Sequence, residues 1–352
     1  MPFRDLVGHR HLLDLLAGAA TRASLPPSLI FAGPDGVGKR TAAVALAQVV
    51  NCPTPLQRDL SGPVLVGPDP AAPDLVIPDL VINDACGTCA SCTRIARLVH
   101  ADVLLIEPGD TGVIKVDQVR EVIERAGYRP FEGRRRVVIV DEADAMLSEA
   151  QNALLKTLEE PPSASMFVLV TSRPDELLPT VRSRCQRLRF GRLSAGDIAA
   201  VLMQSHGYSS PDAHAAASAA DGSMGQALEG GSDALVEARD AAREVLQHVA
   251  VTSDPRRRLD SAKVLSGGGD RDELRRRLRA LASMVRDLGV IGAQADERCL
   301  ANADLREPLR RLAGSFDRER VSRAFAAINR ALEAVDRNAS PKIVADWLAF
   351  QL

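Results

Sequence analysis

The 352-residue sequence predicts an α/β domain with a parallel sheet, followed by a mostly helical second half. Two apolar runs carry the first part of this prediction: Leu29–Ala32 precedes a glycine-rich loop, and Val137–Val140 precedes two carboxylates. Short runs without polar residues are typical of strands that are buried on both faces, as in parallel sheets. Beyond residue 233 the apolar residues recur at helical spacing, as in the stripe between Val321 and Val335.

Composition narrows the class of protein further. Apolar residues make up 46% of the chain and aromatic residues only 3%, which favours an aliphatic, alanine-rich core of helices. A net charge of −2 argues against a basic coat for nucleic acid, although it leaves room for a local patch. We find no apolar run of membrane-spanning length and no signal-peptide layout, so we expect a cytoplasmic protein. The six cysteines are then expected to be thiols or metal ligands rather than disulfides.

The glycine-rich stretch from Gly33 to Thr41 reads GPDGVGKRT and lies between a predicted strand and a predicted helix. Its spacing, G-x-x-x-x-G-K, is typical of a phosphate-binding loop in this context. Gly33, Gly36 and Gly38 allow backbone N–H groups to turn toward an anion. The helix N-terminus adds partial positive charge, and Lys39 can reach the outer phosphates.

The position after the lysine departs from this pattern. A complete loop carries Ser or Thr there to hold Mg²⁺. Here that place belongs to Arg40, and the hydroxyl of Thr41 comes one residue later, turned away by about 100° on a helix. We therefore expect ATP with Mg²⁺ to bind weakly, or to bind without being cleaved. The alternative is a glycine-rich turn without a ligand.

The segment Phe3–His9 precedes an amphipathic helix at the start of the chain. Nucleotide-binding domains often close over the base with such a segment, so Val7 is a candidate contact. A surface turn is the alternative.

Two carboxylates follow the second apolar run. Asp141 and Glu142 are expected at the carboxyl end of a buried strand, which is where open α/β sheets bind ligands. Asp141 could hold Mg²⁺, and Glu142 could polarise an attacking water. An ordinary acidic turn is the alternative, but together with the loop the motif indicates a nucleoside-triphosphatase fold.

The cysteines form a pattern of their own. Cys86, Cys89 and Cys92 follow C-x₂-C-x₂-C spacing, and Cys52 supplies a fourth thiol. Four thiolates suit a closed, structural Zn²⁺ site, although an iron–sulfur cluster takes the same spacing. The centre of this module, Pro53–Pro78, is rich in Pro, Gly and Asp and predicts a loop with at most a short apolar strand.

A further helix and strand are expected after the carboxylates. Ser148 with Gln151 three residues later predicts a capping box at the start of a helix. Phe167–Val170 predicts a strand, and Thr171 at its end is a candidate sensor of the γ-phosphate or, equally, a cap of the strand end.

Two later segments, Leu154–Pro162 and Ser183–Cys185, resemble motifs of the clamp-loader branch of the AAA+ ATPases. Within that branch the chain is similar to the delta-prime type of bacterial DNA polymerase III subunit and to the related gamma/tau type. The resemblance covers nearly the whole chain, including the cysteine module and Arg337–Lys342. It implies three domains: an AAA+ RecA-like parallel-sheet domain with the zinc module (1–190, module about 52–92), a small helical lid (191–232) and an all-α collar (233–352).

Two departures from the ATP-hydrolysing gamma/tau type favour the delta-prime type. Arg40 displaces the hydroxyl that would hold Mg²⁺. The gamma/tau type also carries an arginine in the lid helix that meets the γ-phosphate, whereas Gly225 and Gln226–Leu228 offer no cation here. Arg184 of the Ser183–Cys185 motif is kept, and the resemblance implies that it acts as an arginine finger on a neighbouring subunit's nucleotide.

The resemblance thus implies a mostly non-hydrolysing subunit in a hetero-pentamer with gamma/tau and delta subunits, joined through the collar. That complex would place a sliding clamp on primed DNA. The alternative is a gamma-like ATPase that turns over ATP at its own site, which Lys39, Asp141 and Glu142 support. A free-standing AAA+ protein such as a helicase loader would explain the loop but not the cysteine module and the collar.

Overall fold

The computed structural model divides the chain into two compact units, Met1–Gly191 and Arg192–Leu352. It describes residues 1–59, 62–64, 75–77, 81–109, 111–229, 231–251, 254–295 and 300–352. Within these ranges no helix has both the length and the apolar character needed to cross a membrane. The division into a nucleotide-binding domain, a lid and a collar stays a prediction.

The first unit is built on a five-stranded sheet whose neighbouring strands are all parallel, as the sequence predicts. The strand order is β6-β7-β8-β1-β9, so the first strand of the chain lies between the last two. Every residue of β7 and β8 is buried, which explains their unbroken apolar runs. The strand bounds are β1 Ser28–Ala32, β6 Val103–Ile106, β7 Arg136–Val140, β8 Ser165–Thr171 and β9 Gln186–Arg189.

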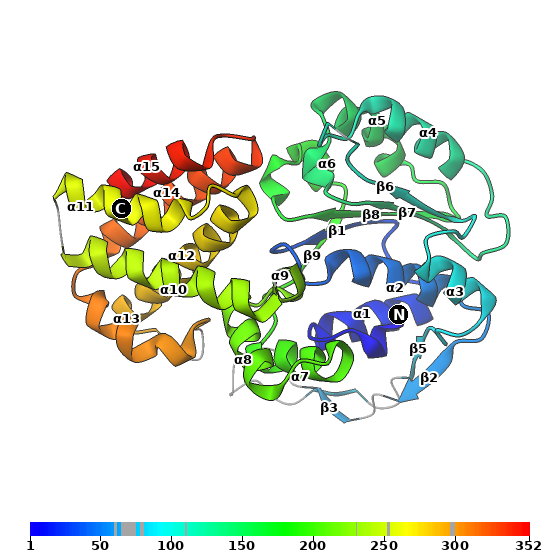
Figure 1. Cartoon of the computed structure of the whole chain (residues 1–352). Helices are drawn as coiled ribbons and strands as arrows, with labels where there is room; N and C mark the ends of the chain where they lie inside the picture. Colours follow the sequence, from blue (N-terminus) through cyan, green and yellow to red (C-terminus); the bar gives the residue numbers. More distant parts are fainter. Residues whose placement is uncertain are drawn as a thin grey trace. The chain divides into compact units, whose positions relative to one another are not determined.

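Helices cover both faces of this sheet, with α1 and α2 on one side and α4 and α5 on the other (Figure 1). Alternate residues of each strand point to opposite faces. In β1, Leu29 and Phe31 pack toward α1 and α2, whereas Ile30 and Ala32 pack toward α4 and α5. The helix bounds are α1 Arg10–Thr21, α2 Lys39–Asn51, α3 Ala90–Ala96, α4 Val116–Ala126, α5 Ser148–Glu159 and α6 Pro179–Arg182.

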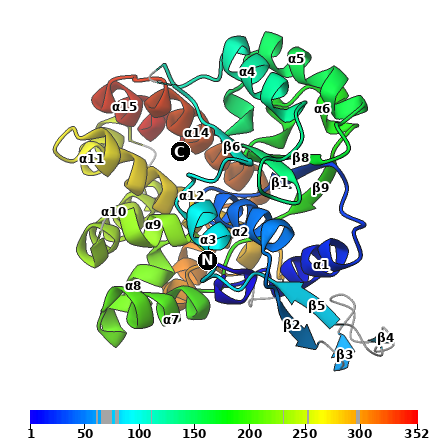
Figure 2. The same ribbon diagram turned by 90° about the vertical axis from the view of Figure 1, so that its right-hand side faces the viewer.

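The cysteine module adds two small antiparallel ladders to the first unit (Figure 2). β2 (Leu56–Asp59) pairs with β5 (Val81–Asp84), and β3 (Gly62–Val64) pairs with β4 (Leu75–Ile77). Much of the segment expected to be a loop lies outside the described residues, but β4 is a short apolar strand of the kind the sequence allowed for.

The expected capping box at α5 is wrong. Ser148 is the first residue of the helix, Leu147 precedes it as N-cap, and no side chain of the described residues caps this end. The Gln151 side chain is instead buried, where its amide donates to the Met146 carbonyl at 3.1 Å and its oxygen accepts from the Leu178 N–H at 2.7 Å. Gln151 thus ties α5 to the segment before α6.

The second unit is helical throughout its described part, as expected. One apolar cluster joins α7, α8 and α9 with the start of α10, and a larger one joins α10 to α15. The stripe from Val321 to Val335 packs into the larger cluster from α14, except for Phe325, which is exposed. The bounds are α7 Ala195–His206, α8 Ser210–Ala219, α9 Met224–Glu229, α10 Gly231–Val251, α11 Pro255–Ser266, α12 Arg271–Gly292, α13 Arg306–Ala313, α14 Arg318–Asp336 and α15 Pro341–Gln351.

Candidate functional site

The glycine-rich loop connects the carboxyl end of β1 to the start of α2. Gly33 lies against the backbone of Phe190, and a Cβ at this position would collide with the Phe190 carbonyl oxygen. Gly36 and Gly38 have φ of 71° and 94°, in the left-handed region that disfavours other residues. The glycines expected to shape a phosphate-binding loop are therefore required by the backbone itself.

Lys39 folds over this loop. Its Nζ donates to the carbonyl oxygens of Gly33 at 2.7 Å and Pro34 at 2.6 Å, and its side chain is only 7% exposed. Burial lowers the pKa of Lys39 from its ordinary value, while the carboxylates of Asp35 and Asp141 oppose that shift. An incoming phosphate would have to compete with the two carbonyls for this ammonium group.

The N-terminal segment reaches the loop through His9. The Nε2 atom of His9 lies 3.1 Å from the Val37 carbonyl, and its ring meets Phe190 edge-on at 4.9 Å. Burial lowers the pKa of His9, with the Val37 carbonyl opposing the shift. Val7 is half-buried two residues earlier. The sequence pointed to this segment but not to His9, because only the fold brings it to Val37.

Arg40 occupies the place where a metal ligand would be expected. Its Nη1 lies 3.1 Å from Asp141 Oδ2 and also contacts Glu107 Oε1. Asp141 follows β7 and Glu107 follows β6, so the two parallel strands bring both carboxylates to one edge of the sheet. A guanidinium group thus neutralises the carboxylate that was expected to hold Mg²⁺. Thr41 lies exposed one residue further along α2.

Glu142 is held in an unusual backbone conformation, with φ 46° and ψ 49°. Non-glycine residues in this left-handed region are uncommon and cluster at functional sites. Partial burial raises the pKa of the Glu142 carboxyl, and the nearby carboxylates of Asp141 and Asp144 raise it further. The acidic pair predicted from the sequence therefore lies at the carboxyl end of β7, beside the loop helix.

Asp144 links the acidic edge to the next strand. The Thr171 hydroxyl donates to Asp144 Oδ1 at 2.6 Å, and Arg173 Nε donates to Oδ2 at 2.9 Å. Thr171, the candidate sensor at the end of β8, is thus engaged by a carboxylate. Asp144 could not be singled out from the sequence, because its partners lie 27 and 29 residues away along the chain.

Arg184 lies at the opposite end of the sheet from the loop. It precedes β9, which runs parallel to β1 with Arg189 opposite Ala32. The four residues of β9, Gln186–Arg189, separate the levels of Arg184 and Gly33, which is roughly 13 Å along the strand. Arg184 therefore does not join the site formed by Lys39.

The four predicted metal ligands come together in the first unit. The sulfur atoms of Cys52, Cys86, Cys89 and Cys92 all lie within 4.8 Å of one another, and Cys52 ends α2 while Cys89 caps α3. Backbone N–H groups point at the sulfurs: Cys86 donates to Cys52 at 3.4 Å and Cys89 donates to Cys86 at 3.3 Å. This donor set could hold a tetrahedral metal ion.

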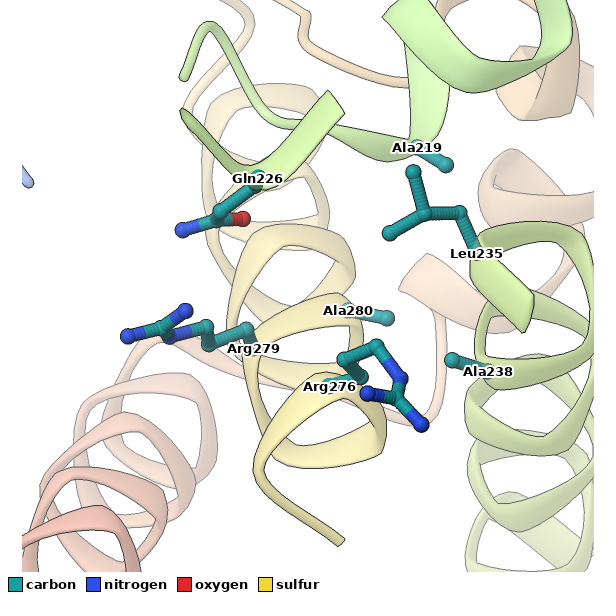
Figure 3. Close-up of a pocket in the computed structure, with 7 residues that line it drawn as sticks. All are labelled: Ala219, Gln226, Leu235, Ala238, Arg276, Arg279 and Ala280. Atoms are coloured by element: carbon teal, nitrogen blue, oxygen red, sulfur yellow. The ribbon is translucent and has the colours of Figure 1, made fainter. Parts of the chain in front are cut away.

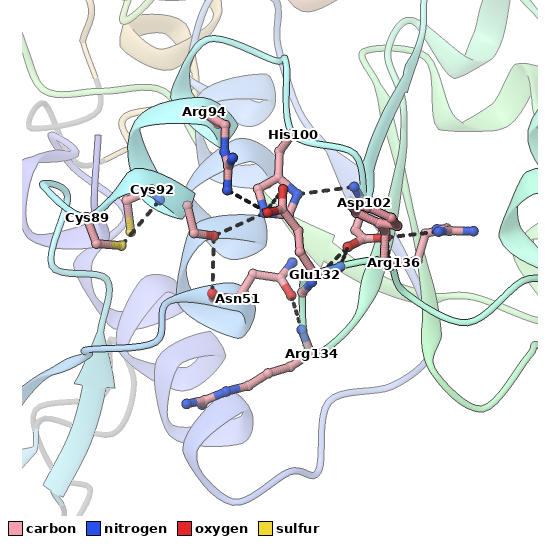
Figure 4. A network of polar contacts seen from close by, with 12 residues as sticks. Asn51, Cys89, Cys92, Arg94, His100, Asp102, Glu132, Arg134 and Arg136 are labelled. Atoms are coloured by element: carbon pink, nitrogen blue, oxygen red, sulfur yellow. Dashed lines mark hydrogen bonds and ion pairs between the residues drawn. The ribbon is translucent and has the colours of Figure 1, made fainter.

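A buried network joins the cysteine module to the loop before β7 (Figure 4). The Ser91 hydroxyl, between two of the cysteines, donates to the Asn51 carbonyl at 3.3 Å and lies 3.2 Å from His100 Nε2. The Asn51 side chain then accepts from the N–H groups of Arg134 at 2.8 Å and Arg135 at 3.0 Å.

Asp102 holds the same loop from the sheet side. It is fully buried and accepts from the N–H groups of Phe131, Glu132 and Gly133 at 2.7, 2.9 and 2.8 Å. Arg136 Nη2 contributes a fourth contact at 2.9 Å. Burial alone would raise the pKa of Asp102, but these donors outweigh it and hold the pKa at about 2. The loop is therefore fixed from both the sheet and the cysteine module.

The second unit carries the position where the lid cation was expected to be missing. Gln226, in α9, lines a small pocket with Arg276 and Arg279 of α12 (Figure 3). Both arginines come from the region predicted as collar rather than from the lid.

Comparisons of the sequence with known proteins find subunits of DNA polymerase III. The family described as DNA polymerase III, delta subunit, matches residues 75–194. The chain is 32% identical over 200 residues to the gamma/tau subunit of DNA polymerase III from Mycobacterium tuberculosis, covering 57% of this chain and 30% of that protein. It is 31% identical over 231 residues to the tau subunit from Escherichia coli, covering 64% of this chain and 32% of that protein. The chain thus spans about a third of the length of these curated relatives.

Solved structures with similar arrangements include a gamma subunit-related protein from Thermotoga maritima, at 16% identity and a TM-score of 0.39, covering 95% of this chain and 97% of that chain. Another is the DNA clamp loader delta protein of Bacillus subtilis, at 11% identity and a TM-score of 0.35, covering 96% of this chain and 98% of that one. Because these TM-scores are low, the description of the fold rests on the strand order alone.

Proposed function

We propose that this chain is a delta-prime-like subunit of a bacterial replicative clamp loader. Its similarity to the delta and gamma/tau subunits of DNA polymerase III, which are clamp-loader proteins of the AAA+ type, supports this proposal. In this role it hydrolyses little or no ATP itself and supplies Arg184 to a neighbouring ATPase subunit. Its partners are gamma/tau and delta subunits in a hetero-pentamer, which loads the sliding clamp on primed DNA.

The contact of Arg40 with Asp141 and Glu107 carries this proposal. Catalysis of phosphoryl transfer depends on Mg²⁺ bridging the phosphates, with the loop hydroxyl and the strand-end aspartate as its anchors. Here the hydroxyl is replaced and the aspartate is paired with a fixed cation. Lys39 and the loop N–H groups of Gly33, Gly36 and Gly38 remain as phosphate-binding groups, with Val7 as a further contact. Weak binding without efficient cleavage follows.

The distance of Arg184 from its own loop supports a role in trans. Arg184 starts roughly 13 Å below the loop along the strands and its guanidinium group is bound to Glu159, so it does not reach a phosphate at Lys39. It can reach the nucleotide of an adjacent subunit, where it would stabilise negative charge that spreads over the γ-phosphate oxygens.

The cysteine cluster supports a structural Zn²⁺ ion. Cys52, Cys86, Cys89 and Cys92 supply four thiolates and leave no open position for a reacting water. Three of the four side chains are buried in a module whose own core is small, so a metal would contribute to its folding.

A second candidate function, a gamma-like ATPase, is favoured by the retained Lys39, Asp141 and Glu142. ATP turnover by the purified chain separates the two. A delta-prime-like subunit should show little turnover alone, whereas rapid turnover that Lys39→Ala abolishes would assign the chain to the gamma/tau type.

The role of Arg184 is tested in a complex reconstituted with the gamma/tau and delta subunits. Arg184→Ala should leave assembly intact and lower DNA-stimulated ATP hydrolysis and clamp loading. Arginine fingers contribute about 10³–10⁵ in rate to a single site in GTPases, but only one interface depends on Arg184, so total turnover should fall only in part. Arg182→Ala, which removes a neighbouring arginine, is the control. Wild-type loading rates in Arg184→Ala would refute the role in trans.

A further inference from the structure

The guanidinium group of Arg184 is almost fully engaged within its own chain. Nε donates to Glu159 Oε1 at 2.8 Å, and Nη2 contacts the same oxygen. Nη1 donates to the Thr180 carbonyl at 2.8 Å and to the Ser183 hydroxyl at 3.3 Å. An arginine offers five N–H donors, so among the described residues these contacts leave one donor unengaged.

This arrangement cannot serve a phosphoryl group as it stands. Guanidinium groups bind phosphate through two parallel N–H bonds, which requires at least two donors on one edge. The Glu159 carboxylate occupies the Nε–Nη2 edge, and its negative charge repels an incoming phosphate. We propose that the contact with Glu159 holds Arg184 in an inactive position, which we call parked, away from the neighbouring nucleotide. The finger then acts only after phosphate replaces this carboxylate. The inference rests on the proposed role of Arg184 in trans.

The pair of Arg184 with Glu159 is strong enough to change how often the finger is released, and weak enough to break reversibly. The side chains of Arg184 and Glu159 are 32% and 48% exposed, and ion pairs this exposed shift an equilibrium by no more than about fivefold. Glu159 is also the last residue of α5, where the partial negative charge of the helix terminus adds to the attraction for a cation. The approach of a triphosphate in a closing interface would be sufficient to exchange the partners.

The test compares idle and stimulated ATP hydrolysis of the reconstituted complex. Glu159→Gln keeps the size of the side chain and removes its charge. Without DNA and clamp, the site served by Arg184 should turn over up to about fivefold faster than in wild type, because the finger is parked less often. The total rate should rise measurably but by less than this, since only one interface depends on Arg184. With primed DNA and clamp, the rate should stay at the wild-type value, since the finger is already released.

Asp175→Asn is the matched control, because it breaks another exposed pair on the same surface, Arg182 Nη1 to Asp175 Oδ1 at 2.6 Å. It should change neither rate. An idle rate that is unchanged in Glu159→Gln would refute parking. A fall in the stimulated rate would also refute it, because Glu159 would then orient Arg184 for catalysis.

The double variant Glu159→Gln/Arg184→Ala separates this inference from the proposed function. It should behave like Arg184→Ala alone, since there is no finger left to release. If Arg184→Ala has no effect on hydrolysis, the role in trans fails. If Arg184→Ala lowers hydrolysis while Glu159→Gln matches wild type, only the parking fails.

Discussion

Arg40 changes the chemistry of the loop more than any other single residue. A hydroxyl at this position would leave Asp141 free to hold a metal, whereas the guanidinium places a fixed single charge between Asp141 and Glu107. A guanidinium cannot bring the water ligands and the double charge of Mg²⁺ to the phosphates.

Arg40→Thr should therefore restore metal dependence without restoring an enzyme. We expect Mg²⁺ to strengthen ADP binding in the variant, while ATP turnover stays slow because Gln226 supplies no lid cation. The lost pairs are partly exposed, so folding stability should fall by only about 1 kcal/mol. Calorimetric titration with ADP, with and without Mg²⁺, measures this. Arg40→Lys is the control, since it keeps a cation in place. Equal Mg²⁺ dependence in wild type and Arg40→Thr would show that Arg40 does not keep the metal from Asp141.

Arg40 could be identified from the sequence, whereas the contacts that it makes could not. Arg40 was recognisable as a departure because its position is fixed by the loop pattern. Its partner Glu107 was not, because it lies 67 residues away and meets Arg40 only through the pairing of β6 with β7. The contacts of His9 and Asp144 are likewise set by the fold.

At the scale of elements, the cysteine module also supports the loop before β7. Its ligands lie next to Asn51 and Ser91, which fix the loop before β7 together with His100. Metal in the cluster should therefore order this loop as well as the module.

Cys89→Ser tests that connection. The variant should lose zinc, and amide hydrogen exchange should speed up in residues 131–136 while β8, with every residue buried, stays protected. Mass spectrometry and elemental analysis report both quantities. Cys185→Ser is the control, because Cys185 is buried outside the cluster and should leave zinc content unchanged. A wild-type protein without zinc would contradict the prediction.

The elements themselves were largely predictable, because buried parallel strands and amphipathic helices have clear apolar periods. The strands around Leu29–Ala32 and Val137–Val140 and the helices of the second unit all appear as expected. The capping box at Ser148 failed because Gln151 finds better partners in the tertiary structure than the local one. A local motif competes with distant groups that the sequence does not reveal.

At the scale of the whole molecule, α15 presents an apolar stripe to solvent. Ile343, Trp347 and Phe350 are exposed, while Val344 and Leu348 on the other face pack into the larger helical core. Tryptophan is among the residues that dominate binding energy at interfaces. The stripe is therefore the surface we expect to join other subunits.

Trp347→Ala should weaken assembly with the gamma/tau and delta subunits by about 30-fold, the loss typical of an interface hot spot. The chain has one tryptophan, so its fluorescence reports assembly directly in the wild type. Sedimentation gives the affinity of the variant. Phe131→Ala, which removes a still more exposed aromatic ring from the first unit, should assemble normally. Equal affinities for both variants and wild type would remove α15 from the interface.

The separation of Arg184 from the loop gives the first unit a direction, like the two unlike ends of a polymer chain. A row of such subunits would grow head to tail, each giving an arginine to the next and receiving one at its own nucleotide. A subunit in which Arg40 pairs with Asp141 can supply an arginine to its neighbour, but it does not need an arginine at its own loop. Such a subunit would stand at the end of the row, and its own residues would determine that position.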